Sequence, residues 1–196
     1  MTGIATLFDA QVASQQLDQS RKDAQRRSRS QAAHVSIWTD FGPGGESRVH
    51  LANRSPDPVS NVGMVFEAKD VEPEEYFPVD AQFGVWLPGL PPCSETIFRA
   101  KAMWYQQGSS AWDDFVPPLK HRPPGRKWRE LTTDSSLVAK KVGFVDRDGI
   151  LWAREEGHLH ALRGDEDLSF SGGLIGVFVG DPQVQPVKLC GEEANG

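Results

Sequence analysis

The sequence predicts a mainly β protein, namely an immunoglobulin-like antiparallel β-sandwich preceded by one N-terminal α-helix. Short runs of alternating apolar and polar residues recur about every ten residues, and turn residues rather than helices separate them. The clearest turn is Asp148-Gly149, which lies between two short apolar runs and is typical of a tight β-hairpin. In contrast, residues 5–33 contain neither glycine nor proline and have the composition of a helix.

This pattern divides the chain into three regions. We expect a polar N-terminal helix over residues 1–33, a β-sandwich domain over residues 34–162 and a C-terminal extension over residues 163–196. The larger apolar residues of the helix end at Leu17, so the helix lacks the sustained apolar seam that a self-sufficient coiled coil needs.

Within the sandwich domain, strands are indicated by period-two alternation and by β-branched or aromatic residues. The expected strands cover residues 35–39, 48–53, 59–68, 83–87 and 95–104, followed by a three-strand meander within 139–162. Residues 106–136 are polar and contain two Pro-Pro pairs, so we expect a long excursion between strands. Residues 174–179 are a candidate for one more strand.

The charge is distributed unevenly along the chain, whose net charge is −6. Residues 1–34 carry five Lys or Arg and three Asp, whereas the remainder carries 16 basic and 24 acidic residues. The acidic body argues against nucleic-acid binding by the domain.

Neither a secretory signal nor an apolar run of about 18 residues is present, so we expect a cytoplasmic protein without a transmembrane segment.

Few residues have the spacing of a reactive or metal-binding site. His158 and His160 would face the same side of a strand and are the best pair of candidate metal ligands. Because no third ligand is evident, we expect no cofactor there. Cys93 and Cys190 lie far apart, and the sequence leaves open whether they pair. Residues 146–149 start like a calcium loop but lack its later ligands, which favours a hairpin turn.

The sharpest charge cluster is the basic segment 120–129, which contains one tryptophan. Arginine and tryptophan are enriched where proteins bind one another. We therefore predict that a partner contacts Trp112, Trp128, Arg126, Lys127 and Arg129, while Trp38 and Trp152 belong to the core. The alternatives are a solvated loop with Trp128 packed on the sandwich, or a segment that binds phosphate groups.

A second candidate contact surface is the start of the helix, where Leu7 and Phe8 are adjacent apolar residues. The same helix carries basic residues between 21 and 29. Together these features also fit peripheral contact with an anionic membrane surface.

Several segments together resemble a family of uncharacterised actinobacterial proteins of the Streptomyces type. In that family an N-terminal helical or transmembrane segment leads into a small β-rich domain. The matching segments are Gln31 to Trp38, Asn53 to Val59, Leu90-Pro91-Pro92-Cys93 and the run from Phe144 to Leu159 with its Asp146, Gly149, Trp152, Arg154 and Gly157. The chain departs from the family in the 106–136 excursion, the C-terminal extension and the lack of a transmembrane helix. The resemblance implies a fold and no reaction.

These observations predict a non-enzymatic module for protein–protein interaction, as an adaptor or an accessory subunit of a larger assembly. The partner itself is not identified by the sequence. The alternatives are a metal-binding protein or enzyme that uses His158 and His160, and a binder of nucleic acid or anionic membranes through the basic stretches 21–29 and 120–129.

Overall fold

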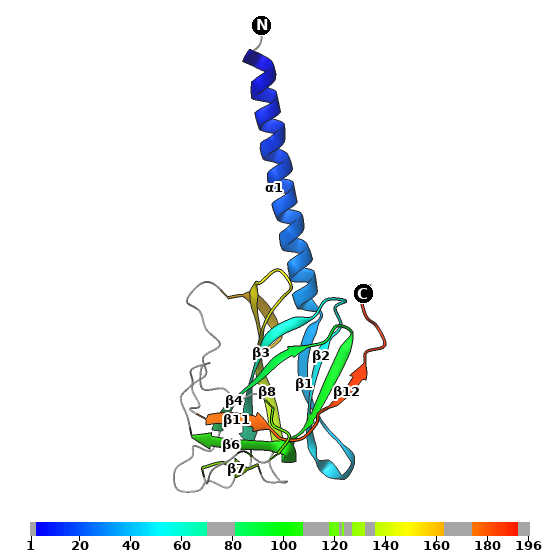
Figure 1. Ribbon diagram of the computed structural model, residues 1–196, viewed down its shortest axis with the longest axis vertical. Coiled ribbons are helices and arrows are strands. Elements are labelled where there is room, and N and C mark those ends of the chain that lie inside the picture. The colour runs from blue at the N-terminus through cyan, green and yellow to red at the C-terminus, as the bar shows by residue number, and fades with distance from the viewer. Residues whose placement is uncertain are drawn as a thin grey trace.

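The computed structural model describes residues 3–69, 81–107, 118–121, 123, 127–131, 136–162 and 174–191. It contains one long helix and two β-sheets, which confirms the mainly β class and the N-terminal helix (Figure 1). The elements are α1 (Gly3–Ala33), β1 (Val35–Phe41), β2 (Ser47–Asn53), β3 (Val59–Lys69), β4 (Ala81–Leu90), β5 (Ser94–Arg99), β6 (Met103–Gln107), β7 (Arg129–Glu130), β8 (Ser136–Val145), β9 (Leu151–Glu155), β10 (His158–Ala161), β11 (Leu174–Phe178) and β12 (Gln183–Pro186), with short 3-10 turns at Pro43–Gly45 and Ala100–Ala102.

The two sheets differ in size. The small sheet has the order β1-β2-β5-β12, and the large sheet has the order β10-β9-β8-β3-β4-β11-β6-β7. Among the described strands, every pair is antiparallel except β4 and β11, which run parallel. The large sheet is therefore mixed rather than purely antiparallel. Figure 1 shows β6 and β11 running across the direction of β1 and β2.

One hydrophobic core draws its side chains from both sheets. The small sheet contributes Val35, Val49, Leu51 and Phe98, and the large sheet contributes, among others, Val62, Met64, Phe66, Phe83 and Phe144. Phe98 of β5 stacks on Phe178 of β11 with ring centroids 4.2 Å apart, which joins the sheets directly. Complete burial of one such side chain stabilises the fold by about 1.5–3 kcal/mol.

The expected single strand over residues 95–104 is wrong, because the structure divides it into two strands of different sheets. β5 ends at Arg99, the 3-10 turn Ala100–Ala102 follows, and β6 starts at Met103. Phe98 and Met103 are both buried in the core. On one uninterrupted strand, residues an odd number of positions apart would face opposite sides. The turn removes this conflict and lets both side chains enter the core.

The chain beyond the meander contributes to both sheets. β11 confirms the candidate strand over residues 174–179 and lies inside the large sheet, and β12 forms an edge of the small sheet. Part of the expected excursion is also structured. β7 lies within residues 106–136 and pairs with β6, and Leu119 forms an isolated bridge with Val179.

Candidate functional site

The last turn of α1 is the part of the helix that packs on the sheets. Ser28, Gln31 and Ala32 are buried there. Gln31 donates through Nε2 to the Pro58 carbonyl oxygen at 3.3 Å, and its Oε1 accepts from the Arg147 backbone N–H at 3.5 Å. We call this contact of the last turn with the β2–β3 and β8–β9 turns the helix junction.

Asp146 is the centre of the helix junction. Asp146 is buried, with only 4 % of the residue exposed. One oxygen accepts the backbone N–H groups of Asp148 and Ile150 at 2.9 and 2.8 Å. The other accepts Trp152 Nε1 at 2.8 Å and the Ser28 hydroxyl. The same carboxylate therefore shapes the β8–β9 hairpin turn, as expected, and fastens α1 to it.

Arg154 completes the helix junction by satisfying carbonyl groups at the end of α1. Its Nη2 donates to the Ala33 carbonyl oxygen and its Nε to the Val35 carbonyl oxygen, both at 3.0 Å. The last carbonyls of a helix lack partners inside the helix, and a cation there also opposes the helix dipole. Burial lowers the pKa of Arg154 from its ordinary value.

The shaft of α1 before this turn stands away from the sheets (Figure 1). Its described side chains from residue 13 to residue 27 are exposed, apart from the half-buried Asp23. Leu17 is 53 % exposed, and the basic residues between 21 and 29 all face solvent. Leu7 and Phe8 lie within α1, but their side chains are outside the described part of the structure.

The prediction that Trp128 lies outside the core is wrong. Trp128 is 7 % exposed and packs with Ile175 and Val177 of β11, beside Leu119 and Trp104. These two β11 residues alternate with Leu174 and Phe178, which enter the main core, so β11 is buried on both faces.

The other residues of the predicted partner surface have different outcomes. Lys127 and Arg129 are exposed, whereas Trp112 and Arg126 lie outside the described residues. Of the two tryptophans assigned to the core, Trp152 is buried. Trp38 is half-buried and stacks on His50 with ring centroids 4.9 Å apart, so its assignment to the core is wrong.

The candidate metal ligands and the cysteines are also placed. His158 and His160 lie on β10 and are both exposed. In the described part of the chain, no three His, Cys, Asp or Glu side chains are grouped as a metal site. Cys93 and Cys190 form a disulfide, which joins the turn before β5 to the segment after β12. A thiolate nucleophile at Cys93 is therefore not available while this bond is intact.

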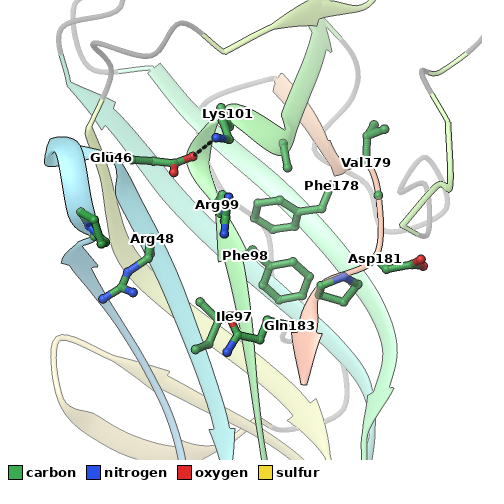
Figure 2. A pocket seen from close by; sticks show the side chains of 15 residues that line it. Glu46, Arg48, Ile97, Phe98, Arg99, Lys101, Phe178, Val179, Asp181 and Gln183 are labelled. Carbon is green, nitrogen blue, oxygen red and sulfur yellow. Dashed lines mark ion pairs between the residues drawn. The ribbon is translucent and has the colours of Figure 1, made fainter. Parts of the chain in front are cut away.

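A groove that the sequence did not reveal lies at the end of the sheets opposite α1, with a volume of about 560 Å³. We call it the end groove. It is lined by the β1–β2 turn, the end of β5, the following 3-10 turn and the link from β11 to β12, which include Pro43, Glu46, Arg48, Ile97, Phe98, Arg99, Lys101, Phe178 and Asp181 (Figure 2). Its lining combines charged side chains of both signs with apolar ones. The groove therefore offers both polar and apolar contacts to a ligand.

A row of polar side chains crosses the small sheet near the end groove, and we call it the charged row. Arg48 donates to both oxygens of Asp40, at 2.8 and 2.6 Å. His50 lies between two carboxylates, with Nε2 2.9 Å from Asp40 Oδ1 and Nδ1 2.6 Å from Glu95 Oε1. The contact of His50 with Asp40 is an ion-pair distance only, and among the described residues His50 Nε2 has no hydrogen-bond partner. Gln185 of β12 then donates to Glu95 at 2.7 Å.

The charged row holds the pKa values of its carboxyl groups down. The hydrogen bonds from Arg48 lower the pKa of Asp40 below its ordinary value. Burial alone would raise the pKa of Glu95, but the hydrogen bonds from Gln185 and His50 outweigh burial and lower it. The row links β1, β2, β5 and β12, and its charged side chains have their partners within the row.

Comparison with protein-family models, with curated proteins and with solved structures gives no match for this chain. No helix in the described part of the structure has the length and apolar character needed to cross a membrane.

Proposed function

We propose that this protein is a non-enzymatic interaction module in which α1 is the contact arm and the β-domain is the body it carries. The observation that carries the proposal is the contrast along α1. Its last turn is buried and hydrogen-bonded, whereas its described shaft is exposed. A long helix that is polar all round and lacks its own domain as a packing surface is typical of a connection between two bodies.

The way α1 is fastened supports the same role. Asp146 and Arg154 of the β8–β9 hairpin reach the end of α1, and Gln31 of the last turn reaches the Pro58 carbonyl oxygen in the β2–β3 turn, so the direction of the helix is fixed relative to the sheets. A helix held in a fixed direction presents its surface with little loss of conformational entropy when a partner binds. Leu7 and Phe8 remain the proposed anchors, and Trp128 is withdrawn because it is buried.

For the body, we infer a β-sandwich of the immunoglobulin-like class. The inference is supported by a shared core between two sheets and by strands of the expected spacing. The parallel pairing of β4 with β11 and the eight strands of the large sheet distinguish this body from antibody domains.

The test of the interaction role uses the tagged full chain in extract of its own cells. The double variant Leu7→Asp/Phe8→Asp is compared with the matched variant Gln15→Asp/Gln16→Asp, which changes the same charge on exposed positions of the shaft. A version without residues 1–33 is run beside them. We expect one protein to co-purify at constant stoichiometry with the wild type and the Gln variant, and to be lost from the other two.

Light scattering of the purified chain over a range of concentrations separates a second copy of the chain from a different partner. Equal recovery of the same proteins by all versions would contradict the role of α1 as contact arm. Binding that depends steeply on salt and on anionic lipid vesicles instead would favour the alternative of a membrane-surface contact.

The disulfide bears on where the protein works. Such bonds persist in oxidising compartments and are rare in the cytosol. The Cys93–Cys190 pair therefore favours an oxidising location over the cytoplasmic one expected from the sequence. Trapping free thiols in intact cells with a mass-tagging reagent distinguishes the two. An unmodified chain supports the oxidising location, and a chain tagged on both cysteines supports the cytoplasm.

A further inference from the structure

We propose that the end groove is a binding site for a small organic monocarboxylate, held through its carboxylate by Arg99. The site lies at the opposite end of the sheets from α1 and is independent of the proposed contact arm (Figure 1). Its volume of about 560 Å³ is within the range of pockets that enclose small organic ligands.

The cations of the end groove differ in whether the chain itself neutralises them. Arg48 is held by both oxygens of Asp40, and Lys101 Nζ lies 3.5 Å from Glu46 Oε1. Arg99 is exposed and has no ion pair or side-chain hydrogen bond with any described residue. Figure 2 draws Arg99 between the Glu46–Lys101 pair and the ring of Phe98. An arginine placed in this way has its donors available to a ligand.

The register of the small sheet places a second arginine directly beside Arg99. Arg48 of β2 pairs directly with Arg99 of β5 across the strands. Like charges directly opposite each other destabilise a sheet. Asp40 compensates Arg48, whose guanidinium it contacts at 2.6 Å, but it makes no ion pair with Arg99. An anion bound at Arg99 would compensate the second arginine and remove the repulsion.

The other lining residues favour a single negative charge with an apolar body. Glu46 and Asp181 also line the groove, and both would repel a doubly charged phosphate. In contrast, the planar guanidinium matches one carboxylate with two parallel hydrogen bonds. Pro43, Ile97 and the stacked pair of Phe98 and Phe178 provide the apolar wall against which the rest of the ligand packs.

The test measures binding of 4-phenylbutyrate to the full chain by titration calorimetry, with 4-phenylbutyramide as the neutral probe of the same shape. We expect the acid to bind and the amide to bind at least about tenfold more weakly, because a charge-assisted hydrogen bond is lost. Arg99→Gln should weaken binding of the acid by about tenfold or more. Arg99→Lys should restore part of it, and the matched control Arg29→Gln, on an exposed arginine of α1, should leave it within about twofold.

A second pair of probes distinguishes a free acid from the end of a peptide chain. A tripeptide that ends in phenylalanine is compared in its free and amidated forms. Tighter binding of the free peptide than of 4-phenylbutyrate, lost on amidation and in Arg99→Gln, identifies a peptide carboxylate as the source. The reverse order identifies a small acid. Both results keep the carboxylate site.

Three results would overturn the proposal. The first is the absence of binding of every carboxylate probe at millimolar concentration. The second is equal binding by wild-type and Arg99→Gln proteins, whose melting curves show that both are folded. The third is tighter binding of inorganic phosphate than of the carboxylates, because the acidic side chains of the groove should exclude it.

Discussion

The two ends of the β-domain use charged residues in opposite ways. At the helix junction, Asp146 accepts four donors, Arg154 donates to the carbonyl groups of Ala33 and Val35, and Arg147 pairs with Asp57 at 2.7 Å. At the end groove, Arg99 has no such contact among the described residues. The charged groups named at the helix junction are therefore satisfied inside the chain, whereas at the end groove the Arg99 guanidinium is left accessible beside the paired Arg48 and Lys101.

This difference separates residues that hold the fold together from residues that are available to a ligand. A buried carboxylate or a buried N–H donor that loses its partner remains desolvated without a hydrogen bond. The fold is destabilised by the full cost of that desolvation. An exposed guanidinium remains hydrated and costs little without a partner. Mutations at the helix junction should therefore change stability, and mutations on the rim of the end groove should change binding.

The largest loss of stability should come from Trp128→Ala. This variant tests whether the buried side chains at the groove end of the domain contribute to stability as the helix junction does. Trp128 covers the face of β11 opposite Phe178. Removal of this buried indole should lower the free energy of unfolding by about 3–5 kcal/mol in urea. The exposed neighbour Lys127→Ala is the control and should change it by less than about 0.5 kcal/mol. A loss below about 1 kcal/mol would mean that Trp128 is a surface residue after all.

Trp128 also shows where prediction from the sequence ends. The helix, the Asp148-Gly149 hairpin and the alternation of Val62, Met64 and Phe66 were predictable, because each depends on residues close together in the chain. Trp128 stands among basic residues, which locally indicates a surface, and β11 buries it from a distant part of the sequence. The pairing of Cys93 with Cys190 and the end groove likewise depend on strands that the sequence does not bring together.

The second prediction concerns Asp146→Ala, which removes the shared acceptor of the helix junction. The buried N–H group of Trp152 and the partly buried backbone N–H groups of Asp148 and Ile150 would lose their partner. We expect a loss of about 3 kcal/mol in urea-induced unfolding. Faster proteolysis near the end of α1 should accompany it, because the helix loses its fastening. Asp148→Ala, in the same turn but exposed, should have a much smaller effect. Similar losses in both variants would show that Asp146 has no special role.

The third prediction concerns how the charged row makes the stability of the fold depend on pH. The pKa values of Asp40 and Glu95 are lowered from ordinary values of 3.8 and 4.5. Groups with a lowered folded-state pKa stabilise the fold above their unfolded pKa, and this contribution is lost as the pH falls through the folded-state value. Stability should therefore decrease with acidification below about pH 4.5.

The comparison is between the wild type and Asp40→Asn/Glu95→Gln, each unfolded in urea at pH 6, 4 and 3. The double variant should be less stable at pH 6, because it loses the charge-assisted contacts of Arg48 with Asp40 and of His50 with Glu95. It should also lose less stability between pH 6 and 3, because two titrating groups are gone. Parallel curves for the two proteins would show that the charged row contributes nothing to acid sensitivity.

The smallest expected effect on stability is that of Arg99→Gln. A small effect here, beside the large effect of Asp146→Ala, would distinguish the end groove from the helix junction. Arg99 faces Arg48 across the sheet, so its removal relieves repulsion while it breaks no described hydrogen bond. The free energy of unfolding should stay constant or rise by a few tenths of a kcal/mol, about the size of other exposed cross-strand effects. A loss above about 1 kcal/mol would place Arg99 among the structural residues. The charged residues of the end groove would then stabilise the fold as those of the helix junction do, and the difference between the two ends would not hold.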